Sequence, residues 1–240
     1  MKYCLGKHAP RLDPRNVKLR DVLRADLPPL PERFDAEDHY LIPSRMFCND
    51  TLGDCVIACR ANLQMMMMAV DGRIIIPTED EVKREYFRET GGEDTGLNLT
   101  DSLNDWHKRG WIVGGKVCRI GGWASVELDD HEAICRAMVT PGFGLALGEI
   151  ITDREQQEFE AGQSWDVAGD DSSGGGHCIS CFAYTPDGPV VRTWARKQQE
   201  SWAFFAERAD EAMVVWPENH PAINHERFHN ALTATDRGQA

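Results

Sequence analysis

The chain has 240 residues, of which 42% are hydrophobic and 27% are charged, and its formal net charge is -13. This length can bury one sizeable core, and the acidic balance excludes a basic face for wrapping nucleic acid. Residues 1–30 contain no apolar run typical of a signal peptide, and no segment has the length of a membrane span. We therefore expect a cytoplasmic protein, or one assembled into a phage particle, that binds neither nucleic acid nor membranes.

Residues 1–45 differ from the rest of the chain because they are locally basic and rich in proline, which favours extended backbone. Their basic residues include Arg11, Lys18, Arg20 and Arg24. One short helix is expected within residues 16–25. We interpret residues 1–45 as an extended N-terminal arm that lies on the domain or on neighbouring protein subunits; the alternative is a solvated tail.

The stretch that begins at Asn49 predicts a turn that leads directly into a helix. Asp50, Gly53 and Asp54 are typical turn and capping residues. From Cys55 onward, apolar residues recur at the helical period of three and four positions. Cys55 is therefore expected in the first helical turn, where free backbone N–H groups and the helix dipole favour a thiolate. The run of methionines that follows is interpreted as core filler.

The middle of the chain predicts three further helices and two extended segments. Thr78 begins a capping box, Thr100 can cap the next helix, and Asp129 begins the third. Residues 111–120 are expected to be extended. Residues 143–151 form a continuous apolar run of strand length, which predicts a buried strand.

The last third of the chain predicts mainly strands. Residues 152–176 are polar and rich in glycine, and a connection of this length favours a functional loop. Residues 177–184 and 189–194 then predict a hairpin, and residues 212–216 a last strand. Because helices come first and strands later, the sequence predicts an α+β fold. Residues 217–240 are expected to form a polar C-terminal tail.

The cysteines and histidines predict neither a metal site nor a cofactor. Eight cysteines without a secretory signal favour free thiols. Cys178 and Cys181 form a CxxC pattern, but residues three apart on a strand face opposite sides and cannot easily hold one metal. His220, His225 and His229 are interpreted as part of a solvated end.

Two distant motifs can supply the groups that thiol chemistry needs. A cysteine attacks a carbonyl carbon as its thiolate, so it needs a base for its proton and fixed donors for the developing oxyanion. His177, at the head of the hairpin, is the best base because imidazole titrates near neutral pH. The Cys55 backbone N–H and the Asn49 amide are candidate oxyanion donors. The arrangement requires the strand that begins at His177 to pack beside the Cys55 helix.

This pattern resembles the papain-like cysteine peptidase superfamily, which has a side-chain amide six residues before a Cys at a helix start, a distant His, and then a Trp motif. The resemblance implies that Cys55 is the nucleophile and His177 the base. Asn49 stands where papain-type enzymes have Gln, which is longer. Trp194 and Trp202 are expected to pack over the site.

The third catalytic position, normally an Asn or Asp that orients the imidazole, falls on Arg192 or Thr193. A Thr hydroxyl can accept a hydrogen bond from the imidazole N–H, though weakly, whereas an Arg cannot. We therefore take Thr193 as the candidate orienting residue, and Gln198 remains an alternative nearby in the sequence. Loss of an orienting group typically reduces catalysis without abolishing it.

A closer resemblance is to papain-like proteins found in phages and bacterial genomes. Their Asn-Asp-x-x-Gly-Asp-Cys start corresponds to residues 49–55, their Gly-Gly-His strand to residues 175–177, and their Thr-Trp-Gly segment to residues 193–195, where Ala195 replaces Gly. Their late Asp-Glu strand corresponds to Asp210 and Glu211. The resemblance runs from about residue 28 to about residue 216. It implies a papain-like domain over residues 46–216, with N-terminal helices around a central Cys-bearing helix that packs on a C-terminal antiparallel sheet.

The leading hypothesis is a cysteine hydrolase that cleaves a peptide or amide bond of a peptide or protein substrate. The alternative is a catalytically weak or inactive papain-like fold used as a structural or interaction component, for example of a phage particle. Ala195 and the missing orienting Asn favour this alternative. A third hypothesis is a thiol-dependent transferase on the same scaffold. Asp54 is interpreted as a helix cap in every case.

Overall fold

The computed structural model describes residues 3–11, 16–167 and 173–237. Its strands are β1 (Phe34–Asp35), β2 (Trp111–Val113), β3 (Lys116–Cys118), β4 (Gly122–Ser125), β5 (Gly144–Ile151), β6 (Gly175–Thr185), β7 (Gly188–Thr193), β8 (Arg196–Gln199) and β9 (Ala209–Trp216). Its helices are α1 (Leu19–Val22), η1 (Ala36–Asp38), α2 (Cys55–Val70), α3 (Glu79–Thr90), α4 (Leu99–Lys108), α5 (His131–Val139), α6 (Asp153–Glu160), α7 (Trp202–Arg208) and α8 (His225–Arg237). The α+β fold predicted from the sequence is confirmed.

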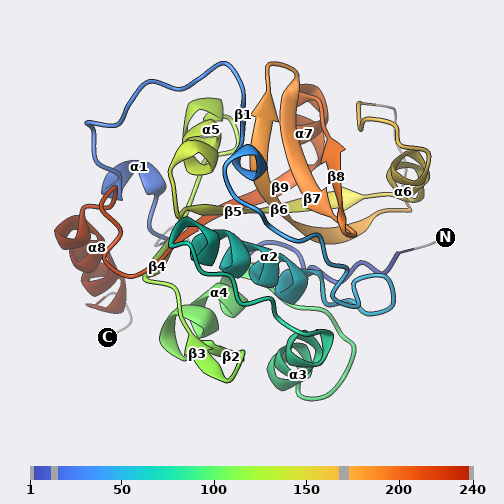
Figure 1. The fold of residues 1–240 in the computed structure, drawn as a ribbon, viewed down its shortest axis with the longest axis horizontal. Coiled ribbons are helices and arrows are strands. Elements are labelled where there is room, and N and C mark those ends of the chain that lie inside the picture. The colour runs from blue at the N-terminus through green and yellow to red at the C-terminus, as the bar shows by residue number, and fades with distance from the viewer. Residues whose placement is uncertain (1–2, 12–15, 168–172, 238–240) are drawn as a thin grey trace.

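One antiparallel sheet, in the order β4-β9-β5-β6-β7-β8 with β1 also paired to β6, runs through the molecule. Helices α2, α3 and α4 lie on one side of it, and α5 and α7 on the other (Figure 1). Because successive strand residues face opposite sides, the sheet separates two cores. In β6, Cys178 and Phe182 belong to the α2 core, whereas Ile179 and Cys181 belong to the other. The two cysteines of the CxxC pattern therefore point into different cores.

Helix α2 is the central helix, and it is buried on nearly every side. Its methionines at positions 65, 66 and 67 are buried, which confirms their role in packing. Arg60, in the middle of α2, is fully buried and forms ion pairs with Glu85 and Glu89 of α3. Its guanidinium also lies 5.0 Å from the ring centroid of Trp106 in α4. Arg60 thus joins α2 to both neighbouring helices.

Several predicted elements are confirmed with shifted boundaries. The capping box at Thr78 begins α3, and residues 143–151 contain β5. The cap of α4 is Asn98 instead of Thr100, and the cap of α5 is Asp130. Residues 111–120 are a small hairpin, β2 and β3, rather than one extended segment.

The long loop predicted for residues 152–176 is partly wrong, because this segment contains helix α6. A capping box between Thr152 and Glu155 begins the helix. The helix is polar along most of its length and buries Phe159 as its one large apolar side chain, so hydrophobic periodicity gave little signal. Residues 168–172 of the predicted loop lie outside the described residues.

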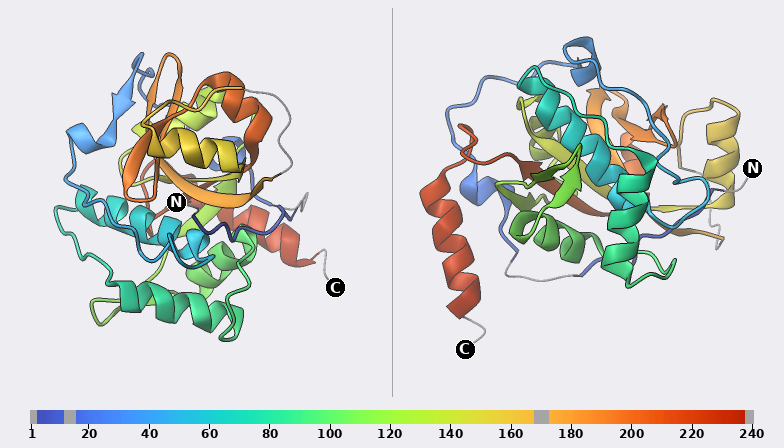
Figure 2. Two further views of the ribbon diagram at one scale, coloured as in Figure 1. Left: turned by 90° about the vertical axis from the view of Figure 1, so that its right-hand side faces the viewer. Right: turned by 60° about the horizontal axis from the view of Figure 1, so that its bottom comes forward.

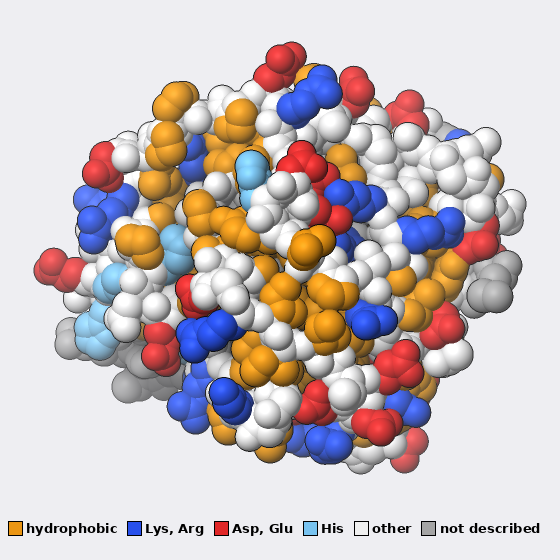
Figure 3. All heavy atoms as spheres, viewed as in Figure 1, with side chains coloured by type: hydrophobic (Ala, Val, Ile, Leu, Met, Phe, Trp, Pro, Cys, Tyr) orange, Lys and Arg blue, Asp and Glu red, His pale blue; other side chains and the backbone are white. Residues whose placement is uncertain are grey.

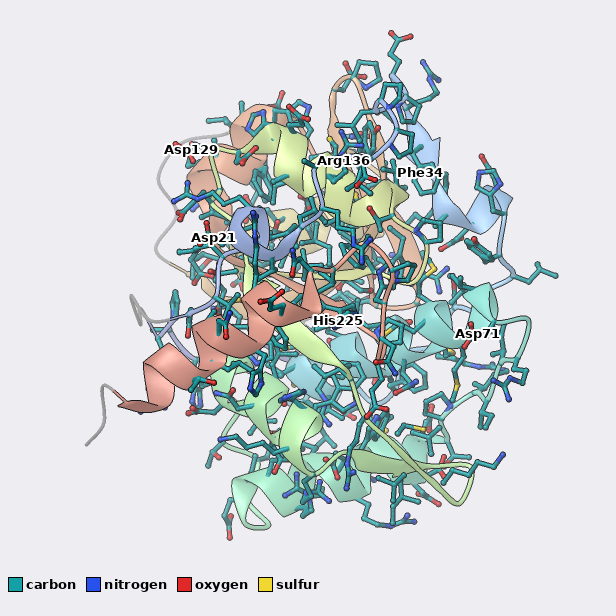
Figure 4. The ribbon with its side chains drawn as sticks, turned by 90° about the vertical axis from the view of Figure 1, so that its left-hand side faces the viewer. Asp21, Phe34, Asp71, Asp129, Arg136 and His225 are labelled. Carbon is teal, nitrogen blue, oxygen red and sulfur yellow. The ribbon has the colours of Figure 1, made fainter. Side chains whose placement is uncertain are left out.

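Helices α1 and α8 pack on the sheet-bearing body through Leu19, Val22 and Phe228. The division of the chain into segments 1–45, 46–216 and 217–240 stays a prediction. Helix α1 contacts α8, as Figure 4 shows with Asp21 in α1 and His225 at the start of α8. Residues 1–2, 12–15 and 238–240 of these end segments lie outside the described residues. On the face shown in Figure 3, acidic and basic side chains are interspersed. No helix in the described part of the chain is long and apolar enough to cross a membrane.

Candidate active site

The candidate nucleophile stands at the first residue of α2, after a tight turn. Phe47 and Cys48 adopt left-handed backbone conformations in this turn, with φ values of 56° and 67°. Asp54 occupies the N-cap position but makes no side-chain capping bond, so its predicted role as a helix cap is wrong. A capping residue normally has extended backbone, whereas Asp54 has ψ 15°. Its carboxyl is buried instead, and burial raises its pKa to about 8.

The Cys55 thiol is fully buried, and burial raises its pKa to about 12. The nearby backbone N–H groups of Cys178 and Gly6 oppose this rise in pKa. The expectation that the helix start holds Cys55 as a thiolate is therefore wrong for this conformation. The loss of water outweighs the helix dipole, which is worth only about 1 kcal/mol.

His177 lies near the start of β6 with its imidazole buried and held from two directions. Its Nε2 is 2.8 Å from Oγ1 of Thr193, and its ring stacks on Trp194 with centroids 4.7 Å apart. Burial lowers the pKa of His177 to about 3, so the ring is neutral. Its Nδ1 is buried and has no hydrogen-bond partner among the described residues. The imidazole is thus oriented at Nε2 and has a free nitrogen for proton transfer.

The turn between β7 and β8 positions the indole that covers His177. Trp194 and Ala195 both adopt left-handed conformations, with φ values of 43° and 61°. This conformation is costly for a bulky side chain and is commonly found at functional sites. Trp202, also predicted to cover the site, instead stacks on His131 of α5 at 4.2 Å.

Of the three candidate orienting residues, only Thr193 contacts His177. Arg192 points away and binds Glu37 and the Ile42 carbonyl. Gln198 donates a 2.8 Å hydrogen bond to the carbonyl of residue 163. The structure therefore provides a hydroxyl, a weaker acceptor than an Asn or Asp oxygen, at the third position of the site.

Asn49 lies in the turn that precedes α2, where its side chain is buried. Its backbone N–H donates a 3.2 Å hydrogen bond to Met46. Its Oδ1 has no hydrogen-bond partner in the described parts of the chain. The amide thus belongs to the turn next to Cys55, and its contribution to an oxyanion hole stays a prediction.

Helix α2 packs on β6, which brings the two sequence motifs together. Cys178, the residue after His177, belongs to the same core as Cys55, and its backbone N–H lowers the pKa of the thiol. The His177 ring stacks on Trp194, a residue of the other core, and its Nδ1 has no partner within residues 3–11, 16–167 and 173–237. Proton transfer between Cys55 and His177 therefore stays a prediction.

The N-terminal arm passes between β6 and the start of α2 (Figure 2, left), where Gly6 lies against Gly53. The Lys7 N–H donates a 2.9 Å hydrogen bond to the carbonyl of Gly176, immediately before His177. On the other side, Gly6 accepts a 2.8 Å bond from Leu97, and His8 donates a 2.9 Å bond to the Leu97 carbonyl. The arm is therefore held by backbone bonds to both sides of the site.

Glycines allow this close approach. A Cβ atom on Gly6 would lie 1.9 Å from the Gly53 carbonyl oxygen, and one on Gly176 would lie 2.2 Å from the Lys7 carbonyl oxygen. The Gly-Gly-His pattern thus has a steric reason, because a side chain at position 176 would exclude the arm. Beyond this crossing, Tyr3 stacks on the outer face of Trp194 with centroids 4.2 Å apart.

Sequence reasoning missed the role of the Asp210–Glu211 pair. Its carboxylates bind the buried ammonium of Lys7, each at 3.0 Å. A lone lysine within the otherwise apolar or small run of residues 3–7 was the available signal. Burial raises the pKa of Glu211, and the nearby Lys7 opposes this rise.

One group of three carboxylates in the described part of the chain has the spacing of a metal site. It consists of Glu85, Glu89 and Asp105. Three arginines already bind these carboxylates; they are Arg60, Arg88 and Arg109. Ion pairs account for this cluster.

No protein-family model matches the sequence, and a search of curated proteins finds no match. Solved structures do match. Xylellain, a cysteine protease from Xylella fastidiosa, aligns with a TM-score of 0.69 and 14% identity over 90% of this chain and 97% of that chain. The proform of the ragweed pollen cysteine protease Amb a 11 aligns with a TM-score of 0.62 and 15% identity, over 80% of this chain and 67% of that chain. A procathepsin B from Trypanosoma congolense aligns with a TM-score of 0.62 and 11% identity, over 90% and 86%. The chain therefore has the fold of papain-like cysteine proteases.

Proposed function

We propose that this protein is a cysteine hydrolase of peptide or amide bonds, with Cys55 as nucleophile and His177 as base, and that its own N-terminal arm holds it closed. The observation that carries this proposal is the course of the arm. An extended segment adds to the backbone edges on both sides of Cys55, at Gly176 and Leu97. Binding sites that add a strand in this way recognise extended peptides.

The closed arm explains why both reacting groups are neutral. It keeps water from Cys55 and His177, and burial raises the pKa of the thiol and lowers that of the imidazole. Once the arm leaves, water reaches both groups and reduces the shift that burial causes in each pKa. The arm itself escapes attack because Gly6 presents its N–H to the sulfur, while its carbonyl oxygen is bonded to Leu97.

With the arm displaced, Nδ1 of His177 takes the proton from Cys55, and the thiolate attacks the substrate carbonyl carbon. The Cys55 backbone N–H and the Asn49 amide stabilise the oxyanion. The imidazolium then gives its proton to the leaving amine, which breaks the C–N bond and leaves a thioester. Water, deprotonated by His177, hydrolyses the thioester and restores the thiol. The Thr193 hydroxyl accepts a hydrogen bond from Nε2–H throughout and fixes the ring.

The test uses the full chain with Gly6→Val, which cannot keep the arm seated because its Cβ would overlap Gly53. Ala9→Val is the matched control, because Ala9 lies in the same arm with an exposed side chain. We expect the first variant to degrade fluorescein-labelled casein at least ~10-fold faster than the control or the unaltered chain, and Cys55→Ser to abolish the gain. A variant whose Cys55 reacts with iodoacetamide but which cleaves nothing would rule out the hydrolase.

A second candidate is the inactive papain-like fold used as an interaction component, for example of a phage particle. The neutral, buried Cys55 and His177 and the weak acceptor at Thr193 favour it. In that case the arm, once released, would contact neighbouring subunits, and the protein would be found in the particle as well as in the cytoplasm. This candidate would be supported if the Gly6→Val variant left casein intact although its Cys55 reacted with iodoacetamide.

A further inference from the structure

The Lys7 side chain occupies a closed slot beside the candidate nucleophile. It has no exposed surface, although lysine almost never lies fully buried without a partner. Its Nζ donates 3.0 Å hydrogen bonds to Asp210, Glu211 and the His8 carbonyl. All three ammonium protons therefore have an acceptor, which is the environment of a bound cation.

The slot is shaped for an unbranched side chain. Its wall is Gly148 of β5, where a Cβ atom would lie 2.4 Å from Cε of Lys7 and 2.7 Å from Cγ of Glu211. Gly148 pairs with Glu211 on one side and with Cys178 on the other. Because Cys178 packs in the same core as Cys55, the slot lies one strand away from the strand that packs on the candidate nucleophile.

The charge of the slot requires a cation. Asp210 and Glu211 face a single ammonium, so the occupied slot is still negative, and the vacated slot would hold two carboxylates without a counter-charge. Burial already raises the pKa of Glu211. An uncompensated buried charge is unfavourable, so a second basic side chain would be drawn in when Lys7 leaves.

We propose that the slot between Gly148, Asp210 and Glu211 is a specificity pocket for a lysine side chain of a polypeptide substrate, and that Lys7 is its intramolecular occupant. This inference rests on the proposed function. The selected side chain would lie next to the reacting bond, since Lys7 directly follows Gly6, which packs against Gly53, two residues before Cys55. Substrates would therefore be lysine-containing peptides, and the arm would compete with them.

The test measures peptide binding apart from hydrolysis, in the full chain with Gly6→Val. Three acetylated, amidated tetrapeptides serve as probes: Leu-Gly-Lys-His, the sequence of residues 5–8, and its versions with norleucine or Glu in place of Lys. The readout is protection of Cys55 from iodoacetamide, followed by mass spectrometry. We expect the Lys peptide to protect at a concentration at least ~10-fold lower than the other two, a difference typical of a charge-assisted contact.

The pocket variant is Asp210→Asn with Glu211→Gln, which keeps the shape of the slot and removes its charge. We expect it to lose the preference for Lys while its Cys55 still reacts with iodoacetamide. Lys7→Glu, which repels the arm from the same carboxylates, replaces Gly6→Val if the latter does not fold. Equal protection by all three peptides would overturn the pocket.

Casein cleavage separates the two proposals. Cleavage without any preference for the Lys peptide would leave the hydrolase standing and overturn the pocket. Selective protection by the Lys peptide without cleavage of casein would overturn the hydrolase and leave a pocket that binds a lysine-bearing peptide.

Discussion

Lys7 and Gly176 are joined by a 2.9 Å backbone hydrogen bond, one residue before the imidazole of His177. This bond links the start of the chain to the late hairpin and closes the site between them. Because Gly6 then lies against Gly53, water is kept from Cys55. The arm thus contributes to the burial that raises the pKa of Cys55.

Thr193 is expected to act on the reaction through the orientation of His177. Thr193→Val keeps the size of the side chain and removes the acceptor 2.8 Å from Nε2. In the Gly6→Val background, we expect casein cleavage to fall about 10-fold or more, with stability lowered by only about 1 kcal/mol. Thr193→Ser retains the hydroxyl and should keep most of the activity. Equal activity of the Val and Ser variants would show that the hydroxyl has no role.

Arg60 is expected to be essential for the stability of the helical side. Arg60→Met leaves Glu85 and Glu89 without their buried partner, which typically costs about 3–5 kcal/mol. Arg88→Met is the matched control, since Arg88 binds the same two glutamates from a side chain that is 36% exposed. That change should cost about 1 kcal/mol or less. Urea unfolding measures both, and equal losses would contradict this assignment.

The buried carboxyls of Glu149 and Glu200 are expected to make the protein less stable as the pH rises. Burial raises the pKa of Glu149 to about 8 and that of Glu200 well above its ordinary value. The folded state therefore keeps a proton that the unfolded chain has released above about pH 4.5, and stability is lost as the pH rises towards 8. Asp54, whose pKa is also raised to about 8, adds to the same trend.

Glu149→Gln should reduce the loss of stability between pH 6.5 and 8. The free energy of unfolding that is lost over this range should become smaller by up to about 2 kcal/mol, because each pKa unit is worth about 1.4 kcal/mol. The buried, neutral His177 adds little to the pH dependence of stability in this window. Its destabilising effect develops as the pH falls below about 6.5 towards its folded pKa of about 3. Urea unfolding at pH 6.5, 7 and 8 measures the slope. An unchanged slope in the variant would mean that Glu149 is already ionised in the folded protein.

Local sequence patterns predicted the elements that carry strong periodicity or capping signals. The α2 helix, the hairpin of β6 and β7, and the capping box at Thr78 follow from such signals, because near neighbours in the sequence determine them. Helix α6 was missed, since a polar surface helix with one buried aromatic residue, Phe159, has little hydrophobic periodicity. Its capping box at Thr152 was the overlooked signal.

Candidate site residues could be chosen from the sequence where the residue type limits the chemistry. Their burial and their partners could not, because tertiary contacts determine them. Thr193 was preferred as the partner of His177, because a hydroxyl can accept a hydrogen bond from the ring and an arginine cannot, and its Oγ1 lies 2.8 Å from Nε2. The buried state of Cys55 could not be predicted, because it depends on a segment about fifty residues earlier in the chain. Asp210 and Glu211 were recognised as a pattern but not as the partners of Lys7, because that ion pair joins segments about two hundred residues apart in the sequence.

The pH dependence of Cys55 alkylation, with the arm displaced, tests the central claim most directly. In the full chain with Gly6→Val, iodoacetamide should label Cys55 with a midpoint below about 8.5, and His177→Ala in the same background should move that midpoint upward. The unaltered chain should react far more slowly, since its thiol has a pKa raised to about 12. A midpoint at or above about 8.5 that is insensitive to His177→Ala would contradict the Cys–His pair.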